Sequence, residues 1–159
     1  LVNVIKYAGE RYRRSFCATS FLYLSSPEGI ASLEKHRESK TGGMGHACEL
    51  ETSLILHLRP DLVHMDLVRD DTDFITTPSY YMDWVEGGAL VANPPWDDDS
   101  INGAYGSGSL GTAEKGRIWL QEAINEKILQ VKEINEQQDR REARRNSGFG
   151  LWGMQNNNK

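Results

Sequence analysis

The chain has 159 residues, of which 38% are hydrophobic, and this length fits one domain of ordinary size. A formal net charge of −5 argues against nucleic acid as a partner, because phosphate binding requires a basic face, and no apolar run is long enough to span a membrane. The two cysteines, Cys17 and Cys48, indicate neither a disulfide framework nor a zinc ribbon, so we expect a reducing, cytoplasmic setting.

The first part of the chain predicts a helix, a strand and a second helix. Apolar residues recur at helical spacing over 1–8. Residues 15–24 are rich in aromatic and β-forming side chains, which is typical of a buried strand. Ser26 and Pro27 match the N-cap and the first position of a short surface helix that runs toward Lys40. Because the chain opens inside an apolar element and without a methionine, we expect that an upstream segment is missing.

The next part predicts a glycine turn and a third helix. Three glycines precede His46, and the apolar residues over 47–58 follow a helical period until Pro60 stops the helix. Residues 62–68 alternate weakly between apolar and polar side chains, which predicts a strand or an extended segment.

The last part predicts loops and one long helix. Residues 69–104 indicate loops with short strands, one of them over 89–92, and 93–99 is predicted as a loop. Thr112 is the expected N-cap of the longest helix, whose charged end should be solvated or frayed. The predicted buried face of this helix comprises Leu120, Ile124, Ile128, Val131 and Ile134. Beyond it we expect a mobile arm over 146–159.

The alternation of helices with strands predicts an α/β fold, with a parallel sheet that carries helices on its faces. We expect a single α/β domain over 1–145. Few strands are predicted for a full sheet, which agrees with a missing N-terminal part.

His46 is the strongest candidate for chemistry. Glycines precede it and acids follow it, so it does not lie on an apolar stripe. An imidazole titrates near neutral pH and can act as a general acid, while glycines let the backbone approach a ligand. The helix start that follows offers free N–H groups to a developing negative charge. The alternative is a structural histidine.

Glu49 and Glu51 lie two residues apart at the predicted helix start, so they face different directions and form no paired-carboxylate site. Acids in a first turn stabilise a helix by about 0.3–1 kcal/mol each, which is the structural alternative. The functional hypothesis is that Glu51, one turn past His46, orients the histidine or a substrate N–H.

Three further patterns give weaker hypotheses. Residues 106–111 match G-x-G-x-x-G literally, but no buried strand precedes them, so a dinucleotide site is disfavoured. The less specific alternative is that this loop and the helix start after it bind an anion. His57 and His64 lack the spacing of a zinc helix, and 97–99 lacks the spaced ligands of a calcium loop. We therefore expect no metal site formed by this chain alone.

Residues 45–63 resemble a motif of the creatininase family: a histidine, then Glu-Thr-Ser, an apolar helix and Pro-Asp-Leu-Val. Residues 112–116, Thr-Ala-Glu-Lys-Gly, resemble the start of that family's last helix. The two blocks occur in the family's order. The resemblance covers roughly the C-terminal half to two-thirds of a typical member.

This resemblance implies a three-layer α/β/α fold with a mostly parallel sheet and a metal-dependent hydrolase, usually a hexamer. The family binds two divalent ions, here expected to be Zn²⁺ or Mn²⁺, through an early Glu-x-His-Gly block and a later Asn-Gly-His block. Neither block occurs in this sequence. The resemblance therefore places the metal ligands in a missing N-terminal segment or in a partner chain.

Carried over by position, His46 matches the family's catalytic histidine and Glu51 the glutamate that follows it in the active site. Gly45 and Glu49, in the same block, are the expected substrate contacts. Gly42 and Gly45 occupy the approach where creatininase itself has tryptophans, which argues against creatinine as the substrate.

The leading hypothesis is hydrolysis of a C–N bond in a small cyclic amide or formamide by a homo-oligomer. His46 would protonate the leaving atom or steady the oxyanion, and Glu51 would orient it. Two alternatives remain open. One is a hydrolase that opens an oxidised inositol ring by C–C cleavage, and the other is a non-catalytic fragment or subunit that completes a partner chain.

Overall fold

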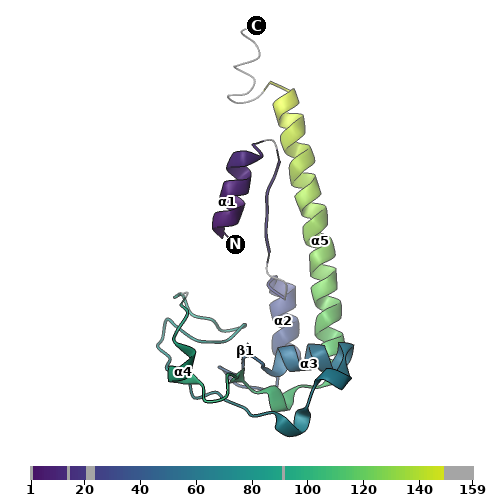
Figure 1. Cartoon of the computed structure of the whole chain (residues 1–159). Coiled ribbons are helices and arrows are strands. Elements are labelled where there is room, and N and C mark those ends of the chain that lie inside the picture. The colour runs from purple at the N-terminus through teal and green to yellow at the C-terminus, as the bar shows by residue number, and fades with distance from the viewer. Residues whose placement is uncertain (1, 14, 21–23, 91, 149–159) are drawn as a thin grey trace. The chain divides into compact units, whose positions relative to one another are not determined.

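The computed structural model describes residues 2–13, 15–20, 24–90 and 92–148 (Figure 1). The chain divides into two compact units, one formed by 1–23 with 125–159 and the other by 24–124.

The first unit contains α1 (Val2–Arg11) and the larger part of the long helix α5 (Ala113–Asn146). Helix α1 confirms the first predicted helix. Residues 16–20 form no helix and belong to no sheet. The backbone N–H of Phe16 donates to Gln138 Oε1 at 2.7 Å, and the Arg141 guanidinium lies 4.5 Å from the centre of the Phe16 ring.

The strand predicted over 15–24 is therefore wrong for 15–20 and for Leu24, and residues 21–23 lie outside the described part. β-Forming side chains make a strand only where a neighbouring strand supplies the hydrogen-bond ladder. Among the described residues, no strand does so here.

The second unit contains the remaining elements and the start of α5. In chain order they are α2 (Pro27–His36), β1 (Met44–His46), α3 (Glu49–Leu58), the single 3-10 turns η1 (Pro60–Leu62) and η2 (Met65–Leu67), α4 (Trp96–Asp99), β2 (Tyr105–Gly106) and the 3-10 turn η3 (Gly108–Leu110). The Ser26 hydroxyl accepts from the N–H of Gly29 at 3.0 Å, which confirms the predicted N-cap of α2. Helix α3 ends before Pro60, as predicted.

Strands β1 and β2 form a two-stranded antiparallel sheet, in which Met44 pairs with Gly106 and His46 with Tyr105. A Cβ at Gly45 would lie 2.6 Å from the carbonyl oxygen of Tyr105, so this close approach requires glycine. Mixed helices with a small sheet are compatible with the α/β prediction. The described residues do not show the expected parallel sheet with three layers.

Three local predictions in the middle of the chain are wrong. Residues 62–68 contain the last residue of η1 and all of η2 instead of a strand. The described residues of 89–92 form no regular element, and 93–99, predicted as a loop, contains α4. The two segments predicted to be extended, 62–68 and 89–92, pair with no strand of the described structure, so no hydrogen-bond ladder stabilises them as strands.

The hydrophobic core lies in the second unit. Its buried members are Leu24, Leu33, Met44, Cys48, Leu50 and Trp119. The Trp119 indole is fully buried, and its N–H donates to the carbonyl oxygen of Ser32 at 3.2 Å. This bond joins α5 to α2, so the start of the long helix is anchored in the core.

Helix α5 begins as predicted, because the Thr112 hydroxyl accepts from the N–H of Lys115 at 3.2 Å. Its charged continuation is helical to Asn146. The predicted buried face is wrong for Ile124, Ile128 and Val131, which are 44%, 51% and 56% exposed. The spacing places these side chains on one face of α5, but they are buried only where another helix or strand packs against that face.

Of the predicted arm over 146–159, residues 149–159 lie outside the described part. Across the residues that the structure describes, no helix combines the length and apolar character needed to cross a membrane.

Candidate functional site

His46 ends β1, and only Ala47 and Cys48 separate it from the first residue of α3. Ala47 has a φ of 49°, in the left-handed region. This conformation costs a non-glycine residue about 1–2 kcal/mol, and it turns the chain from strand to helix within two residues. The sharp turn places the side chain of His46 beside the first turn of α3.

The His46 imidazole faces the Glu51 carboxylate. Nδ1 of His46 lies 3.5 Å from Oε2 of Glu51, and the two side chains are 53% and 23% exposed. The same Oε2 accepts from the backbone N–H of Ala47 at 2.7 Å. Glu51 therefore bonds back to the residue that precedes the N-cap of α3, and the same carboxylate faces the imidazole. The structure brings together the two residues that the sequence singled out.

An aromatic cluster lies on another side of the imidazole. The ring centres of His46 and Trp96 are 5.0 Å apart, with planes inclined at 68°. The ring centres of Trp96 and Tyr105 are 4.7 Å apart. Tyr105 also stacks on Phe74, with 4.5 Å between the ring centres. Burial and the nearby Asp99 carboxylate raise the pKa of Tyr105, so its hydroxyl remains a donor, 3.4 Å from Asp99. His46 is thus flanked by an acid and an indole.

Trp96 is a site residue that the sequence analysis missed. It follows two prolines in a segment predicted as a loop, far from His46 along the chain. The available signal was a large aromatic side chain in a polar loop, where binding residues often occur. Glycines precede His46 in the sequence, and α4 supplies an indole to it from elsewhere in the fold.

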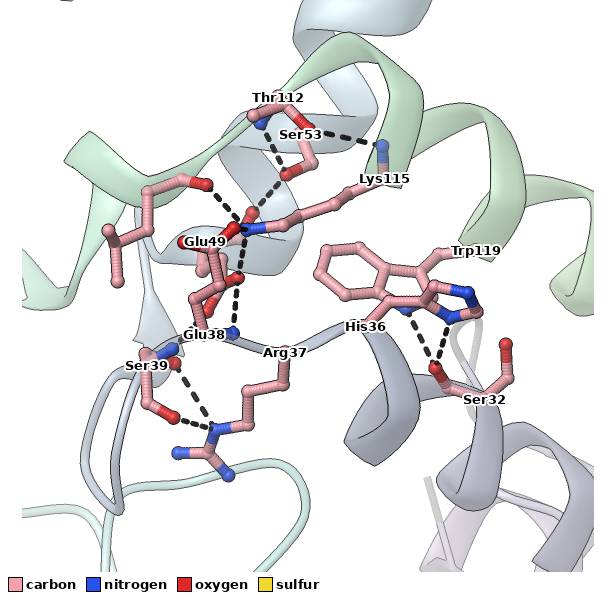
Figure 2. A network of polar contacts seen from close by, with 11 residues as sticks. Ser32, His36, Arg37, Glu38, Ser39, Glu49, Ser53, Thr112, Lys115 and Trp119 are labelled. Carbon is pink, nitrogen blue, oxygen red and sulfur yellow. Dashed lines mark hydrogen bonds and ion pairs between the residues drawn. The ribbon is translucent and has the colours of Figure 1, made fainter.

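Glu49 points into the protein. Its side chain is fully buried, and it accepts from the N–H groups of Glu38 and Ser39 at 2.9 and 2.8 Å and from the Lys115 ammonium at 2.6 Å (Figure 2). Burial alone would raise the pKa of Glu49, but the hydrogen bonds from Lys115 and the turn outweigh it and lower the pKa. This geometry gives no support to the expected substrate contact by Glu49.

The remaining residues of the block serve packing. Gly45 is buried, and a Cβ there would also lie 2.8 Å from Met82 Cγ, so its expected contact with substrate stays a prediction. Cys48 is buried in the core, and burial raises the pKa of its thiol to about 11. The thiol is therefore protonated at neutral pH and is a poor nucleophile.

The glycine-rich segment over 106–111 uses its donors within the protein. The N–H and hydroxyl of Ser109 donate to the Asp70 carboxylate at 2.9 and 2.5 Å, and the N–H of Ser107 donates to the carbonyl oxygen of Gly43 at 3.0 Å. An internal carboxylate therefore occupies donors that an anion would need.

Within the described ranges, no group of three or more His, Cys, Asp or Glu side chains is arranged to hold a metal ion. His57 lies in α3, and His64 lies between η1 and η2. The residues described here do not by themselves fit the metal centre that the resemblance implies.

Comparison with known proteins agrees with the sequence blocks. A family model described as Creatininase, creatinine amidohydrolase, matches residues 2–130, which include His46, Glu51 and Trp96. No curated protein and no solved structure matches the chain.

Proposed function

Because the chain belongs to the creatininase family, a family of hydrolases, we propose that it acts in the hydrolysis of a C–N bond in a small cyclic amide or formamide. The observation that carries this proposal is the position of His46. Its half-exposed ring lies against the Glu51 carboxylate, inside the sequence block that the family shares. General acid catalysis requires a proton donor that substrate can reach, and this arrangement supplies one.

In the proposed mechanism Glu51 orients the imidazole. A carboxylate at Nδ1 favours the tautomer that carries a proton there and fixes the plane of the ring. Within the described part of the chain, the other ring nitrogen, Nε2, has no hydrogen-bond partner. Nε2 can therefore meet the leaving nitrogen of a substrate and transfer a proton to it in the protonated ring form.

The family is typically metal-dependent. We propose that divalent ions, Zn²⁺ or Mn²⁺, are held mainly by residues outside this chain. When bound, such ions supply an activated water for hydrolysis. On the same proposal, the chain contributes the C-terminal portion of a three-layer α/β/α fold with a mostly parallel sheet.

We also propose that copies of the protein assemble, as a hexamer on the family's pattern. The exposed apolar side chains of α5, Ile128, Leu129 and Val131, support association, because exposed apolar patches commonly mark interfaces.

The test is the substitution His46→Ala, assayed with creatinine, a formamide and an oxidised inositol in the presence of Zn²⁺ or Mn²⁺. We expect turnover of the best substrate to fall by about 10²–10⁴-fold, because the proton donor is lost, while metal content stays normal. His64→Ala is the matched control, since His64 is exposed in a loop and should leave turnover unchanged. Loss of metal with an unchanged rate per bound ion would contradict the assignment.

A second candidate function, opening of an oxidised inositol by C–C hydrolysis, is favoured by one observation. Trp96 lies beside His46, and the residue that follows it, Asp97, is exposed. An aromatic face beside an acid suits a polyhydroxylated ring. Preference for the inositol over both nitrogen substrates would select this function. No turnover and no bound metal would select the non-catalytic alternative.

A further inference from the structure

The two sequence blocks that resemble the family meet in one buried ion pair. Glu49 of the first block is the first residue of α3, and Lys115 of the second block lies in the first turn of α5. Nζ of Lys115 is 2.6 Å from Oε1 of Glu49, and the side chains are 10% and 0% exposed (Figure 2). The proposed function uses His46 and Glu51 but assigns no role to this pair.

The ion pair joins three segments of the second unit. The Glu49 carboxylate accepts from the N–H groups of Glu38 and Ser39, in the turn that follows α2. The Lys115 ammonium also contacts the Glu38 carboxylate at 2.6 Å and donates to the carbonyl oxygen of Leu110 at 3.0 Å, in the segment before α5. The start of α3 is therefore bonded both to the turn after α2 and to the start of α5.

The segment held by the pair carries the candidate site. Glu49 lies between His46 and Glu51 in the sequence, and the N–H of Ala47 reaches across to Oε2 of Glu51 at 2.7 Å. That hydrogen bond spans the first turn of α3, so it requires this turn to keep its conformation. A shift of Glu49 would therefore move the Glu51 carboxylate relative to the His46 ring.

Both charges depend on each other because they are shielded from water. Burial alone would lower the pKa of Lys115, but the carboxylates of Glu38 and Glu49 outweigh it and raise the pKa. Removing one partner leaves the other as an uncompensated buried charge, which is strongly destabilising. A substitution at Lys115 should thus displace Glu49 rather than leave it in place.

We propose that Lys115 is a positioning residue: its ion pair with Glu49 fixes the first turn of α3 and so holds the Glu51 carboxylate against the His46 imidazole. The catalytic consequence rests on the proposed function. The effect of the ion pair on the position of Glu51 can be measured without any substrate.

The experiment is Lys115→Met in the full chain, followed by the backbone amide signal of Ala47 in ¹H–¹⁵N NMR spectra. Glu51→Ala removes the acceptor and shows where the signal lies when the hydrogen bond is lost. We expect Lys115→Met to move the Ala47 signal most of the way toward that reference position. With an active preparation, we expect kcat to fall by about tenfold or more, with KM within about twofold, because misplacement of a catalytic group costs rate.

Two further variants separate position from stability. Leu33→Ala creates a cavity in the core but removes neither charge of the ion pair, and it should lower stability while leaving the Ala47 signal in place. The double variant Glu49→Gln with Lys115→Met leaves no buried charge unpaired. It should recover stability relative to Lys115→Met but keep the Ala47 signal displaced.

The proposal is overturned if the Ala47 signal of Lys115→Met stays at the wild-type position, or if Leu33→Ala moves it equally far. If the signal moves as expected but His46→Ala leaves turnover unchanged, the positioning role of Lys115 is supported and the proposed function is wrong.

Discussion

At the scale of the residue, the candidate site depends on one unusual backbone conformation. Ala47 adopts a φ of 49° between His46 and the helix that carries Glu51. Most residues at such positions are glycines, because a Cβ clashes with the backbone in the left-handed region. The strain is held by the short bond from the N–H of Ala47 to Glu51 and by the anchored start of α3.

The substitution Ala47→Gly should therefore raise the free energy of unfolding by about 1 kcal/mol, because glycine adopts a positive φ without strain. Urea denaturation followed by circular dichroism measures it. The control is Ala123→Gly, inside α5, which should lower the free energy of unfolding by about 1 kcal/mol. If both substitutions destabilise equally, the left-handed conformation of Ala47 is wrong.

At the scale of the element, α5 shows that helical periodicity and burial are separate properties. Its N-cap was predicted correctly, but its predicted buried face was not: Ile128 and Val131 are half exposed, whereas Trp119 is fully buried in the core. The free energy of burial comes from apolar area removed from water, so a stripe without a partner contributes little to folding.

On this basis, at protein concentrations too low for copies to assemble, Ile128→Lys should change the free energy of unfolding by less than about 0.5 kcal/mol, as is usual for exposed positions. Trp119→Ala should lower it by about 3–5 kcal/mol, because it removes a buried indole. Urea denaturation at several protein concentrations compares the two. A loss of stability at Ile128 that grows with protein concentration would mean that a second copy covers this face.

At the scale of the whole molecule, the free energy of unfolding should depend on pH through the buried ion pair. The pKa of Glu49 is lowered in the folded state, because the hydrogen bonds from Lys115 and the turn outweigh burial. A lowered pKa contributes stability above the carboxyl's unfolded pKa, and this contribution is lost as the pH falls through the folded pKa. The raised pKa of Lys115 acts in the opposite direction, and its contribution is lost only at strongly alkaline pH.

We therefore expect stability to decline as the pH falls below about 4, where an ordinary glutamate begins to protonate. Glu49→Gln should be less stable than the wild type at neutral pH and should show a shallower decline in acid. Thermal unfolding between pH 7 and pH 3 tests this. Glu133→Gln is the control, since Glu133 is exposed and its loss should leave the acid slope nearly unchanged. Equal slopes for the wild type and Glu49→Gln would contradict the expectation.

The amino-acid sequence by itself determined helices α1, α2, α3 and α5 and the pairing of His46 with Glu51. Caps such as Ser26 and Thr112, and the apolar period of each helix, act between residues a few positions apart, so they can be recognised without a fold. Glu51 lies one helical turn past His46, and that short separation made their proximity predictable.

Only the tertiary structure decided the strands and the rest of the site. A strand forms where a distant segment offers a hydrogen-bond ladder. For this reason the strands predicted over 15–24, 62–68 and 89–92 are absent from the described residues of these ranges. Trp96 reaches His46, and Lys115 reaches Glu49, across long stretches of chain. Contacts between residues so far apart follow no sequence period, because packing of the whole unit brings them together.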